Sequence, residues 1–308
     1  MSQSLPAPEP SEQNEQHAAS CATALIVSAS VKLVRKLLNK AATRWKEDDE
    51  HVHQLRVATR RALAAVDLFE PLLPDKECRW LNRNLKHILR AAGKARDLDV
   101  LLKNGIPKSS AALPSLQAFW KKNRRTCQES LHSLNRTKRG KLKKHSVAVS
   151  KLPCADPIPT DTVPQWSNMR RWIRHRLSKC SQGFLKHLAD ASDVESMHQL
   201  RIETKRLRYT LEIVRPALNT AEAESLKTLL SELQDVLGTL NDHVVTLRYL
   251  KRSATSLDTP SDKQAIASLI EARTAKIAAQ RESFRIWLDS PAPEDLRRQL
   301  VSCLAGTI

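Results

Sequence analysis

The sequence predicts an all-α protein, because of its composition and the spacing of its apolar residues. The chain has 308 residues, of which 41% are hydrophobic, only 4% are aromatic and only 6 are glycine. Leu, Ala, Arg, Lys and Glu dominate, and these residues favour helices, whereas sheets favour β-branched and aromatic residues. Apolar residues also recur with the 3.6-residue period of an amphipathic helix. We therefore expect a helical protein with a substantial apolar core.

The apolar period divides the chain into successive helices. It places them at 20–46, 50–72, 75–94, 97–104 and 112–136, and then at 166–190, 194–217, 221–238, 241–255, 262–289 and 294–304. Asp75 after Pro74 marks one helix start, and Ser192 and Glu195 have the spacing of a capping box before another. Gly93 and Gly238 permit a helix end or a close helix crossing after the long third helix of each half.

An internal duplication organises these helices. The segment HQLRVATRR at 53–61 reappears as HQLRIETKR at 198–206, an offset of 145 residues. Without a gap, 14 of the 48 positions from 53 to 100 are identical to their counterparts at this offset. A gapless register of this length indicates two copies of one helical unit. We expect each copy to form a helical bundle, and the two bundles to stack about a pseudo-twofold axis.

Composition also predicts the domain boundaries. We expect a disordered tail at 1–17, the first helical repeat at 18–137, a basic and Pro-rich linker at 138–165 and the second repeat at 166–308. The linker holds four prolines, which cannot continue a helix. The tail lacks the basic and apolar regions of a signal peptide, and we see no run of about 18 apolar residues that would span a membrane. The 6 cysteines have no CxxC or CxxH spacing, which predicts reduced thiols in the cytoplasm.

The charge balance points to an anionic partner. The chain has 51 Lys and Arg residues against 33 Asp and Glu, a formal net charge of +18. On a helical wheel, cations on one side of each duplicated helix form a row opposite the apolar stripe. The first row is His53, Arg56 and Arg60, and the second is His198, Arg201, Lys205 and Arg208. Cations spaced one turn apart, about 4.5 to 6 Å along the axis, suit a linear polyanion.

A solvated helix face is the ordinary explanation for such rows. Two observations oppose it here. Neither row has an acidic residue at the i+3 or i+4 positions until Asp67 and Glu212, one turn further on. Val57 and Ile202 lie among the cations, where a fully solvated face gains nothing from a β-branched residue. We therefore expect the two basic faces to turn toward each other and to line a basic central groove.

Other residues of the repeats are expected to play supporting roles. A metal site is not expected, since neighbouring Arg and Lys would repel Zn²⁺. The histidines are expected to be proton-linked anion contacts, because a bound polyanion raises their pKa. Asp97 and Asp242 are expected to be structural supports, either as caps of a following helix or as clamps that orient an arginine. Arg90 belongs to a basic strip on the third helix that would extend the groove.

These motifs resemble the CHAD domain, the conserved-histidine α-helical domain. The resemblance rests on His-Gln-Leu-Arg-x-x-Thr-Arg-Arg at 53–61, on Met-His-Gln-Leu-Arg-x-x-Thr-Lys-Arg-Leu-Arg-Tyr at 197–209, and on the segments that begin at Gly93 and Gly238. It implies two four-helix bundles around a basic cavity, and inorganic polyphosphate as the ligand. It also implies anion contacts at His53, Arg56, Arg60, Arg61, His198, Arg201, Lys205, Arg206 and Arg208. Arg61 and Arg206 lie about 80° off the rows on the wheel.

The resemblance also bears on catalysis. Family members are often fused to a triphosphatase domain with a metal-holding Glu-x-Glu-x-Lys motif, and this chain has no such motif. We therefore expect a stand-alone, non-catalytic polyphosphate binder without a cofactor, located in the cytoplasm and associated with polyphosphate granules. The alternative is a general nucleic-acid-binding helical protein that relies on the basic run at 136–144. An enzyme acting on phosphoanhydrides would need more metal-holding carboxylates near the cations.

Overall fold

A computed structural model of the chain describes residues 12–48, 50–107, 110, 113–152, 169–257 and 259–305. These residues form helices and contain no strand, which confirms the predicted class. The α-helices are α1 (Glu12–Thr43), α2 (Glu50–Leu68), α3 (Asp75–Asn104), α4 (Leu113–Ser150), α5 (Arg170–Ala189), α6 (Val194–Val214), α7 (Thr220–Ala254), α8 (Pro260–Leu288) and α9 (Ala292–Ala305). Short 3-10 helices η1 (Glu70–Leu72) and η3 (Arg215–Ala217) follow α2 and α6.

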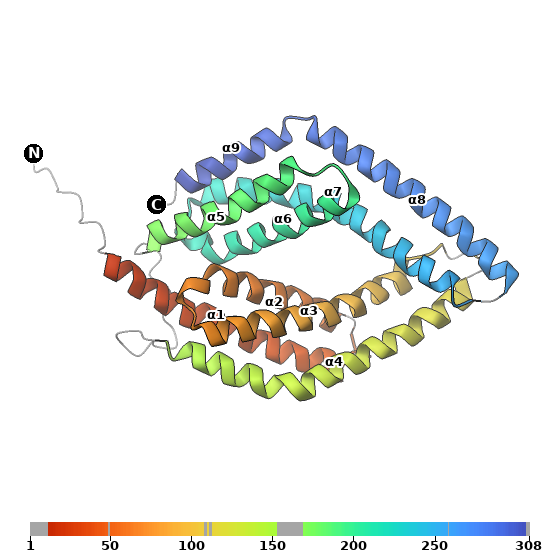
Figure 1. Cartoon of the computed structure of the whole chain (residues 1–308), viewed down its shortest axis with the longest axis horizontal. Coiled ribbons are helices and arrows are strands. Elements are labelled where there is room, and N and C mark those ends of the chain that lie inside the picture. The colour runs from red at the N-terminus through yellow and green to blue at the C-terminus, as the bar shows by residue number, and fades with distance from the viewer. Residues whose placement is uncertain are drawn as a thin grey trace, which may run out of the picture.

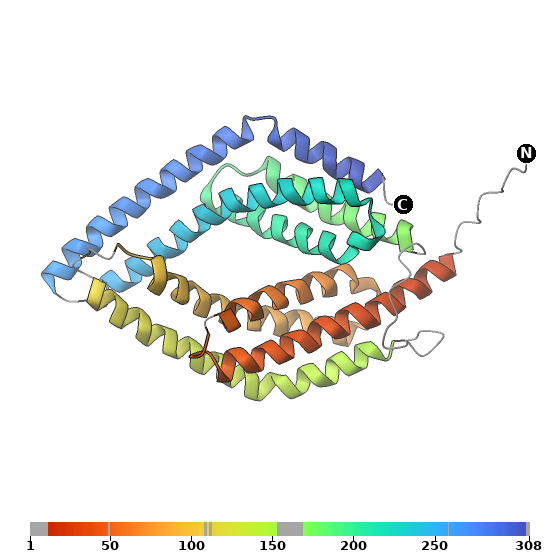
Figure 2. The same cartoon turned by 180° about the vertical axis from the view of Figure 1, so that it is seen from behind.

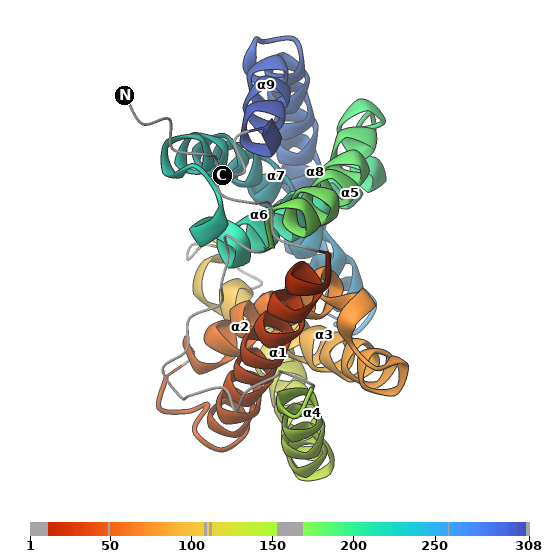
Figure 3. The same ribbon diagram turned by 90° about the vertical axis from the view of Figure 1, so that its left-hand side faces the viewer.

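The helices pack in two groups (Figure 1). In the first group, α1 and α3 each pack on both α2 and α4. In the second group, α6 packs on α5 and α7, while α7 also packs on α8 and α9. Helices α2 and α6 contact each other, and Figure 3 shows them where the two groups meet. The duplicated helices thus lie at the junction between the groups.

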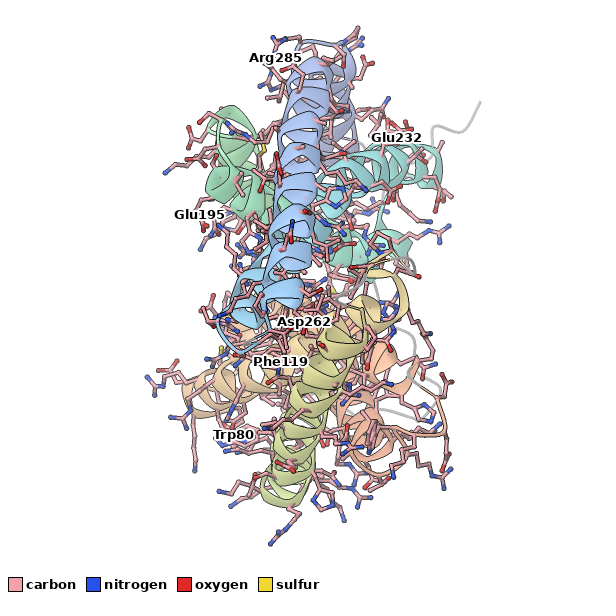
Figure 4. The ribbon with its side chains drawn as sticks, turned by 90° about the vertical axis from the view of Figure 1, so that its right-hand side faces the viewer. Trp80, Phe119, Glu195, Glu232, Asp262 and Arg285 are labelled. Carbon is pink, nitrogen blue, oxygen red and sulfur yellow. The ribbon has the colours of Figure 1, made fainter. Side chains whose placement is uncertain are left out.

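Contacts at both ends of the molecule join the groups. At one end, the rings of Phe69 and Trp172 stack with their centroids 5.3 Å apart, and Arg176 of α5 donates to the backbone carbonyl of Leu68 at 2.9 Å. At the other end, a small core cluster draws residues from α3, α4, α7 and α8. There Trp120 donates its indole N–H to the Ser253 hydroxyl at 3.0 Å. Figure 4 views this end, where α4 and α8 approach each other.

The third helix of each copy is longer than the sequence predicts. Helix α3 runs without a break through Gly93, and α7 runs through Gly238. A glycine inside a helix costs only about 1 kcal/mol relative to alanine. Both helices bury apolar residues on either side of the glycine, such as Ile88 and Leu98 in α3, which offsets that cost. The prediction of separate helices at 97–104 and 241–255 is therefore wrong, and neither Asp97 nor Asp242 caps a helix.

The repeat boundaries also need correction. Helix α4 continues to Ser150. The basic run at 136–144 is therefore helical, and the first part of the predicted linker belongs to this helix. Buried Leu142 and Val149 give this segment an apolar face that packs on the core. The four prolines lie outside the described residues. Helix α1 begins at Glu12, so the predicted tail overlaps it by one and a half turns.

Helix α6, which carries the second basic row, has a different cap from the one predicted. Asp193 is its N-cap, and the Asp193 side chain accepts from the backbone N–H of Ser196 at 2.7 Å. The Ser196 hydroxyl accepts from the backbone N–H of Asp193 at 2.9 Å. Serine replaces the usual Glu at the third helical position, and the pair fixes where α6 begins.

Helix α1 contains an apolar stretch that inspection of the sequence missed. Within His17–Thr43 it is long and apolar enough to cross a membrane, but half of its most apolar window is buried inside the molecule. Val27, Val31 and Leu38 are fully buried in the core. Figure 2 shows α1 lying along the first group beside α4. A core helix can also be long and apolar enough to meet this membrane-span criterion, and we interpret the stretch as such a core helix.

Candidate anion-binding cleft

A cleft of about 710 Å³ lies between the two groups of helices, with α2 and α6 along it. Helices α3, α7 and α8 complete its walls. The site residues predicted from the sequence that line it are His53, Arg56, Arg60, Arg61, Arg201, Lys205 and Arg208, together with Asp97 and Asp242. The basic faces of the two duplicated helices therefore share one space.

Many lining residues come in pairs separated by the repeat offset. Six positions in the first copy that face the cleft have a partner 145 residues later that faces it too. The pairs are Arg56 with Arg201, Arg60 with Lys205, Arg96 with Asn241, Asp97 with Asp242, Val100 with Val245, and Leu101 with Thr246. The two copies thus contribute similar surfaces to the cleft.

Asp97 orients an arginine of the basic row. Its Oδ1 lies 3.4 Å from a terminal nitrogen of Arg56, and both side chains are partly buried. Burial raises the pKa of the Asp97 carboxyl, although Arg56 opposes this effect. Asp242 makes no ion pair with any described residue, but its charge acts on both Arg201 and Lys205. The contact with Arg56 has the geometry of the predicted clamp, whereas Asp97 lies inside α3 and caps no helix.

The cations at the centre of the cleft have lowered pKa values, so their charged forms are disfavoured there. Burial, reinforced by repulsion from Arg201 and Arg60, lowers the pKa of the Lys205 ammonium to about 6. Burial and Arg56 lower the pKa of Arg60 to about 10, and they lower the pKa of Arg201 as well. Arg201 is only 7% exposed, and its buried Nε has no hydrogen-bond partner among the described residues. An anion in the cleft would relieve each of these penalties.

One carboxylate holds two cations at the edge of the cleft. Glu212 accepts from Arg61 at 3.1 Å through one oxygen and from Arg208 at 3.0 Å through the other. The Arg208 guanidinium also lies 4.8 Å from the ring centroid of Tyr209, which is buried. Arg208 has no cationic counterpart in the first copy, where Leu63 stands. This edge is therefore more basic on the α6 side, but Glu212 neutralises part of the charge.

Arg206 lies outside the cleft, contrary to the prediction. Its guanidinium bonds to Asp67 of α2, with Nε at 2.8 Å and a terminal nitrogen at 2.5 Å from Oδ2. The offset of 145 residues relates this pair to Arg61 and Glu212, since Arg206 matches Arg61 and Asp67 matches Glu212. The two pairs are reciprocal ion pairs between α2 and α6, as expected for a twofold junction. Both arginines join the groups, and only Arg61 also faces the cleft.

The two motif histidines occupy different places. His53 lines the cleft and lies 4.0 Å from Glu50. His198 is exposed and does not line the cleft, although its neighbour Asn241 does. Burial, and then Arg201, lower the pKa of His198. The structure therefore brings one of the two predicted histidines into the site.

Arg90 lies away from the cleft as well. It lines a shallow pocket between α3 and α4, next to His87 and Lys94. Arg90 lies about two turns, or about 10.5 Å along the axis of α3, before Asp97, and at this position it lines the pocket against α4. The strip does not extend the cleft.

Three titratable side chains of the cleft were missed from the sequence. Arg96 and His243 each adjoin an aspartate already noted, and Arg273 comes from α8. Arg273 donates to His243 Nδ1 at 2.9 Å and to the backbone carbonyl of Gly105 at 2.9 Å. It therefore links α8 to the end of α3 across the cleft. The motif repeats could have identified Arg96, but α8 has no repeated signal that would have identified Arg273.

The described residues include no group of three or more His, Cys, Asp or Glu side chains close enough to hold a metal ion. The five described cysteines are free thiols, and burial raises the pKa of Cys180 and of Cys303 to about 11. Raised thiol pKa values make these cysteines poor nucleophiles. The chemistry of the cleft is therefore that of a cation cluster.

Comparison with known proteins identifies the family. The family model of the CHAD domain matches residues 31–251. The chain belongs to the CHAD family. The matched region contains every residue that lines the cleft except Arg273, so the CHAD region itself carries both basic rows.

Two solved structures share the CHAD fold of this chain. The crystal structure of the CHAD domain from the plant Ricinus communis has a TM-score of 0.68 and 22% identity, covering 97% of this chain and 94% of its own. PptA from Streptomyces chartreusis has a TM-score of 0.58 and 13% identity, covering 88% of this chain and 99% of its own. No curated protein sequence matches significantly. At these low identities, the two TM-scores establish a common fold and nothing more.

Proposed function

We propose that this CHAD protein binds inorganic polyphosphate, without catalysis, in the cleft between its two groups of helices. The observation that carries the proposal is the convergence of both basic rows on one cleft, where burial and mutual repulsion lower the pKa of Lys205 to about 6. Burial and mutual repulsion destabilise the charged cluster, and a bound ligand of high negative charge density would stabilise it. A phosphate chain has a charge on every unit and suits cations spaced one helical turn apart.

The duplication supports a linear ligand. The lining pairs at an offset of 145 residues and the reciprocal ion pairs between α2 and α6 are what two bundles related by a pseudo-twofold axis would produce. Such an arrangement offers similar contacts to both directions of a chain that is chemically the same from either end. Inorganic polyphosphate has this property, and a nucleic-acid strand does not.

Nucleic acid is the second candidate, and the cleft favours it less. Among the described residues that line the cleft, Tyr209 is the single aromatic, and it is buried beneath Arg208. Proteins that hold single strands usually offer exposed aromatic rings for base stacking. The cleft offers charge without such rings, which suits a chain of phosphates that carries no bases.

A binding role also suits the carboxylates. Asp97 and Asp242 lie among cations, and Asp97 already orients Arg56. Cationic surroundings disfavour a divalent metal at these oxygens. We therefore propose retention or recruitment as the cellular use, with the protein held in the cytoplasm on polyphosphate granules through the cleft.

The test is binding of long-chain polyphosphate to the wild type and to a variant with Arg56, Arg60, Arg201 and Lys205 all changed to alanine. We expect an affinity loss of about 100-fold or more, because each charge-assisted hydrogen bond contributes about 1.5–3 kcal/mol. A matched variant loses four exposed cations outside the cleft, Lys141, Lys144, Lys251 and Lys263, and should lose far less. Affinity of the wild type should also fall steeply with salt, as for other polyanions. Equal losses of affinity in the two variants would refute the proposal that polyphosphate binds in the cleft.

Duplex DNA and RNA serve as competitors in the same assay. Polyphosphate should remain bound when nucleic acid is added at an equal concentration of phosphate groups. Release of phosphate from the chain in the presence of Mg²⁺ or Mn²⁺ would instead indicate an enzyme.

A further inference from the structure

A second basic hollow lies on the first group, between α1 and α4. It has a volume of about 490 Å³ and shares no lining residue with the cleft. Its cations are Lys32, Arg35, Lys36 and Lys40 of α1, Arg44 directly after α1, and Arg139 of α4. Figure 3 places α4 on the side of the first group that faces away from the second group. We refer to this hollow as the outer groove.

The packing of α1 against α4 fixes the shape of the outer groove. The side-chain amides of Asn39 and Asn135 bond across the two helices at 3.2 Å. Gln128 of α4 donates to the backbone carbonyls of Ala41 and Ala42 at 2.9 and 2.8 Å. These polar contacts set the register of two antiparallel helices, so the groove has a rigid floor.

The cations of α1 form a ladder along this floor. Lys32, Lys36 and Lys40 are four residues apart, so they follow one another on one face about 6 Å apart. From Lys32 to Lys40 the helix rises about 12 Å. The ladder repeats the geometry of the basic rows in the cleft, but on a helix outside the duplicated motif.

The charge in the outer groove is unbalanced. None of its lining residues is acidic, and none of its six cations makes an ion pair among the residues that the structure describes. Elsewhere on the surface, cations such as Arg285 and Arg297 pair with acids on the same helix. The buried Nε of Arg35 also lacks a hydrogen-bond partner within the described part of the chain. A buried donor without an acceptor destabilises the empty groove, and a bound oxyanion would offset this cost.

We infer that the outer groove is a second binding site for a linear phosphate chain. The inference rests on the proposed function for the class of ligand, but its residues are separate from those of the cleft. A phosphate chain is favoured over nucleic acid because no aromatic side chain lines the groove for base stacking. Two sites on different sides of one molecule allow a long chain to join neighbouring molecules.

The experiment is calorimetric titration of the full chain with tripolyphosphate, which is too short to join two molecules. The wild type should bind two equivalents. The outer-groove variant, Lys36→Ala with Arg139→Ala, should bind one and keep the cleft's affinity. The cleft variant, Arg56→Ala with Arg201→Ala, should lose the other equivalent. A control with Lys141→Ala and Lys144→Ala removes the same charge from exposed positions of α4 and should keep both.

Each failure has a distinct meaning. An outer-groove variant that still binds two equivalents overturns the inference and leaves the proposed function intact. A cleft variant that titrates like the wild type overturns the proposed function. Single-stranded RNA that displaces tripolyphosphate from the cleft variant, at equal phosphate concentration, overturns the assignment of the ligand. Circular dichroism and melting curves establish that each variant is folded before it is titrated.

Discussion

The two groups of helices are most alike where they face each other and least alike on their outer surfaces. Across the cleft, Arg56 and Arg60 of the first copy face a space that Arg201 and Lys205 of the second copy also face. On the outside, α4 has a single acidic residue, Glu129, and a run of cations. Helix α8, which packs on α7 as α4 packs on α3, mixes acids with bases throughout.

The third helices show the same contrast. Helix α3 carries a strip of cations at the positions where α7 has acidic or neutral residues. The strip is Arg79, Arg83, Lys86, Arg90 and Lys94, against Glu224, Thr228, Ser231, Asp235 and Thr239. The surplus of +18 therefore has two parts. The part in the cleft comes from both copies, whereas the part on the outer surface belongs mainly to the first group and requires a separate explanation.

The largest expected effect tests whether the two copies contribute equally to the cleft. The first-copy variant, Arg56→Ala with Arg60→Ala, and the second-copy variant, Arg201→Ala with Lys205→Ala, should each weaken polyphosphate binding by about 10- to 100-fold. Both remove two cations from equivalent positions. Titration at one fixed salt concentration measures the two losses. A large loss in one variant and none in the other would show that a single row binds the ligand.

A second prediction concerns pH and Lys205, whose pKa in the empty cleft is lowered to about 6. A bound polyanion raises that pKa, so binding takes up a proton at pH values above about 6. Affinity should therefore fall as pH rises above 6, by at most about tenfold per pH unit for one proton. Lys205→Met should flatten this dependence, measured by titration from pH 5.5 to 8.5.

His198→Gln provides the control for this prediction. His198 does not line the cleft, so its substitution should leave most of the pH dependence in place. The sequence pointed to the histidines as the proton-linked contacts. A profile that flattens with His198→Gln and persists with Lys205→Met would restore that view.

Much of this architecture could be predicted from the sequence, because helix faces follow from residue spacing alone. The wheel placed Arg56, Arg60, Arg201 and Lys205 on basic faces, and all four line the cleft. The wheel cannot tell which residues of another helix meet a given face. The resemblance assigned Arg206 to the ligand, whereas Asp67 of α2 holds it.

The remaining errors have two physical causes. Gly93 and Gly238 weaken a helix locally, but packing along the whole of α3 and α7 outweighs them, and local signals do not contain that packing. Arg273 reaches the cleft from α8 because of the tertiary arrangement, and nothing near it in the sequence indicates this. The low pKa of Lys205 likewise depends on burial, which spacing does not reveal.

A third prediction uses the reciprocal ion pairs. Glu212→Gln should strengthen polyphosphate binding several-fold, because Glu212 neutralises Arg61 and Arg208 at the edge of the cleft. Ion pairs of partly exposed groups contribute about 1 kcal/mol at most, which corresponds to about fivefold. The measurement is the same titration at fixed pH and salt.

The duplication supplies the matched control. Asp67→Asn removes the equivalent carboxylate, which holds Arg206 outside the cleft. It should lower the melting temperature through the α2–α6 junction and leave affinity unchanged. If both variants strengthen binding equally, the effect reflects net charge, and Glu212 has no local role.

The smallest expected effect tests the continuity of α3 and α7 in the two groups. A Cβ added at Gly93 or at Gly238 would have no atom within 4 Å outside its own helical turn, and both glycines lie inside helices. Gly93→Ala and Gly238→Ala should therefore each stabilise the fold by about 0.5–1 kcal/mol, measured by urea unfolding. At Gly105, an added Cβ would lie 2.5 Å from the Leu101 carbonyl oxygen, so Gly105→Ala should destabilise. Stabilisation at one repeated glycine and loss at the other would show that the two long helices are not equivalent, and that the likeness of the inner faces does not extend along their full length.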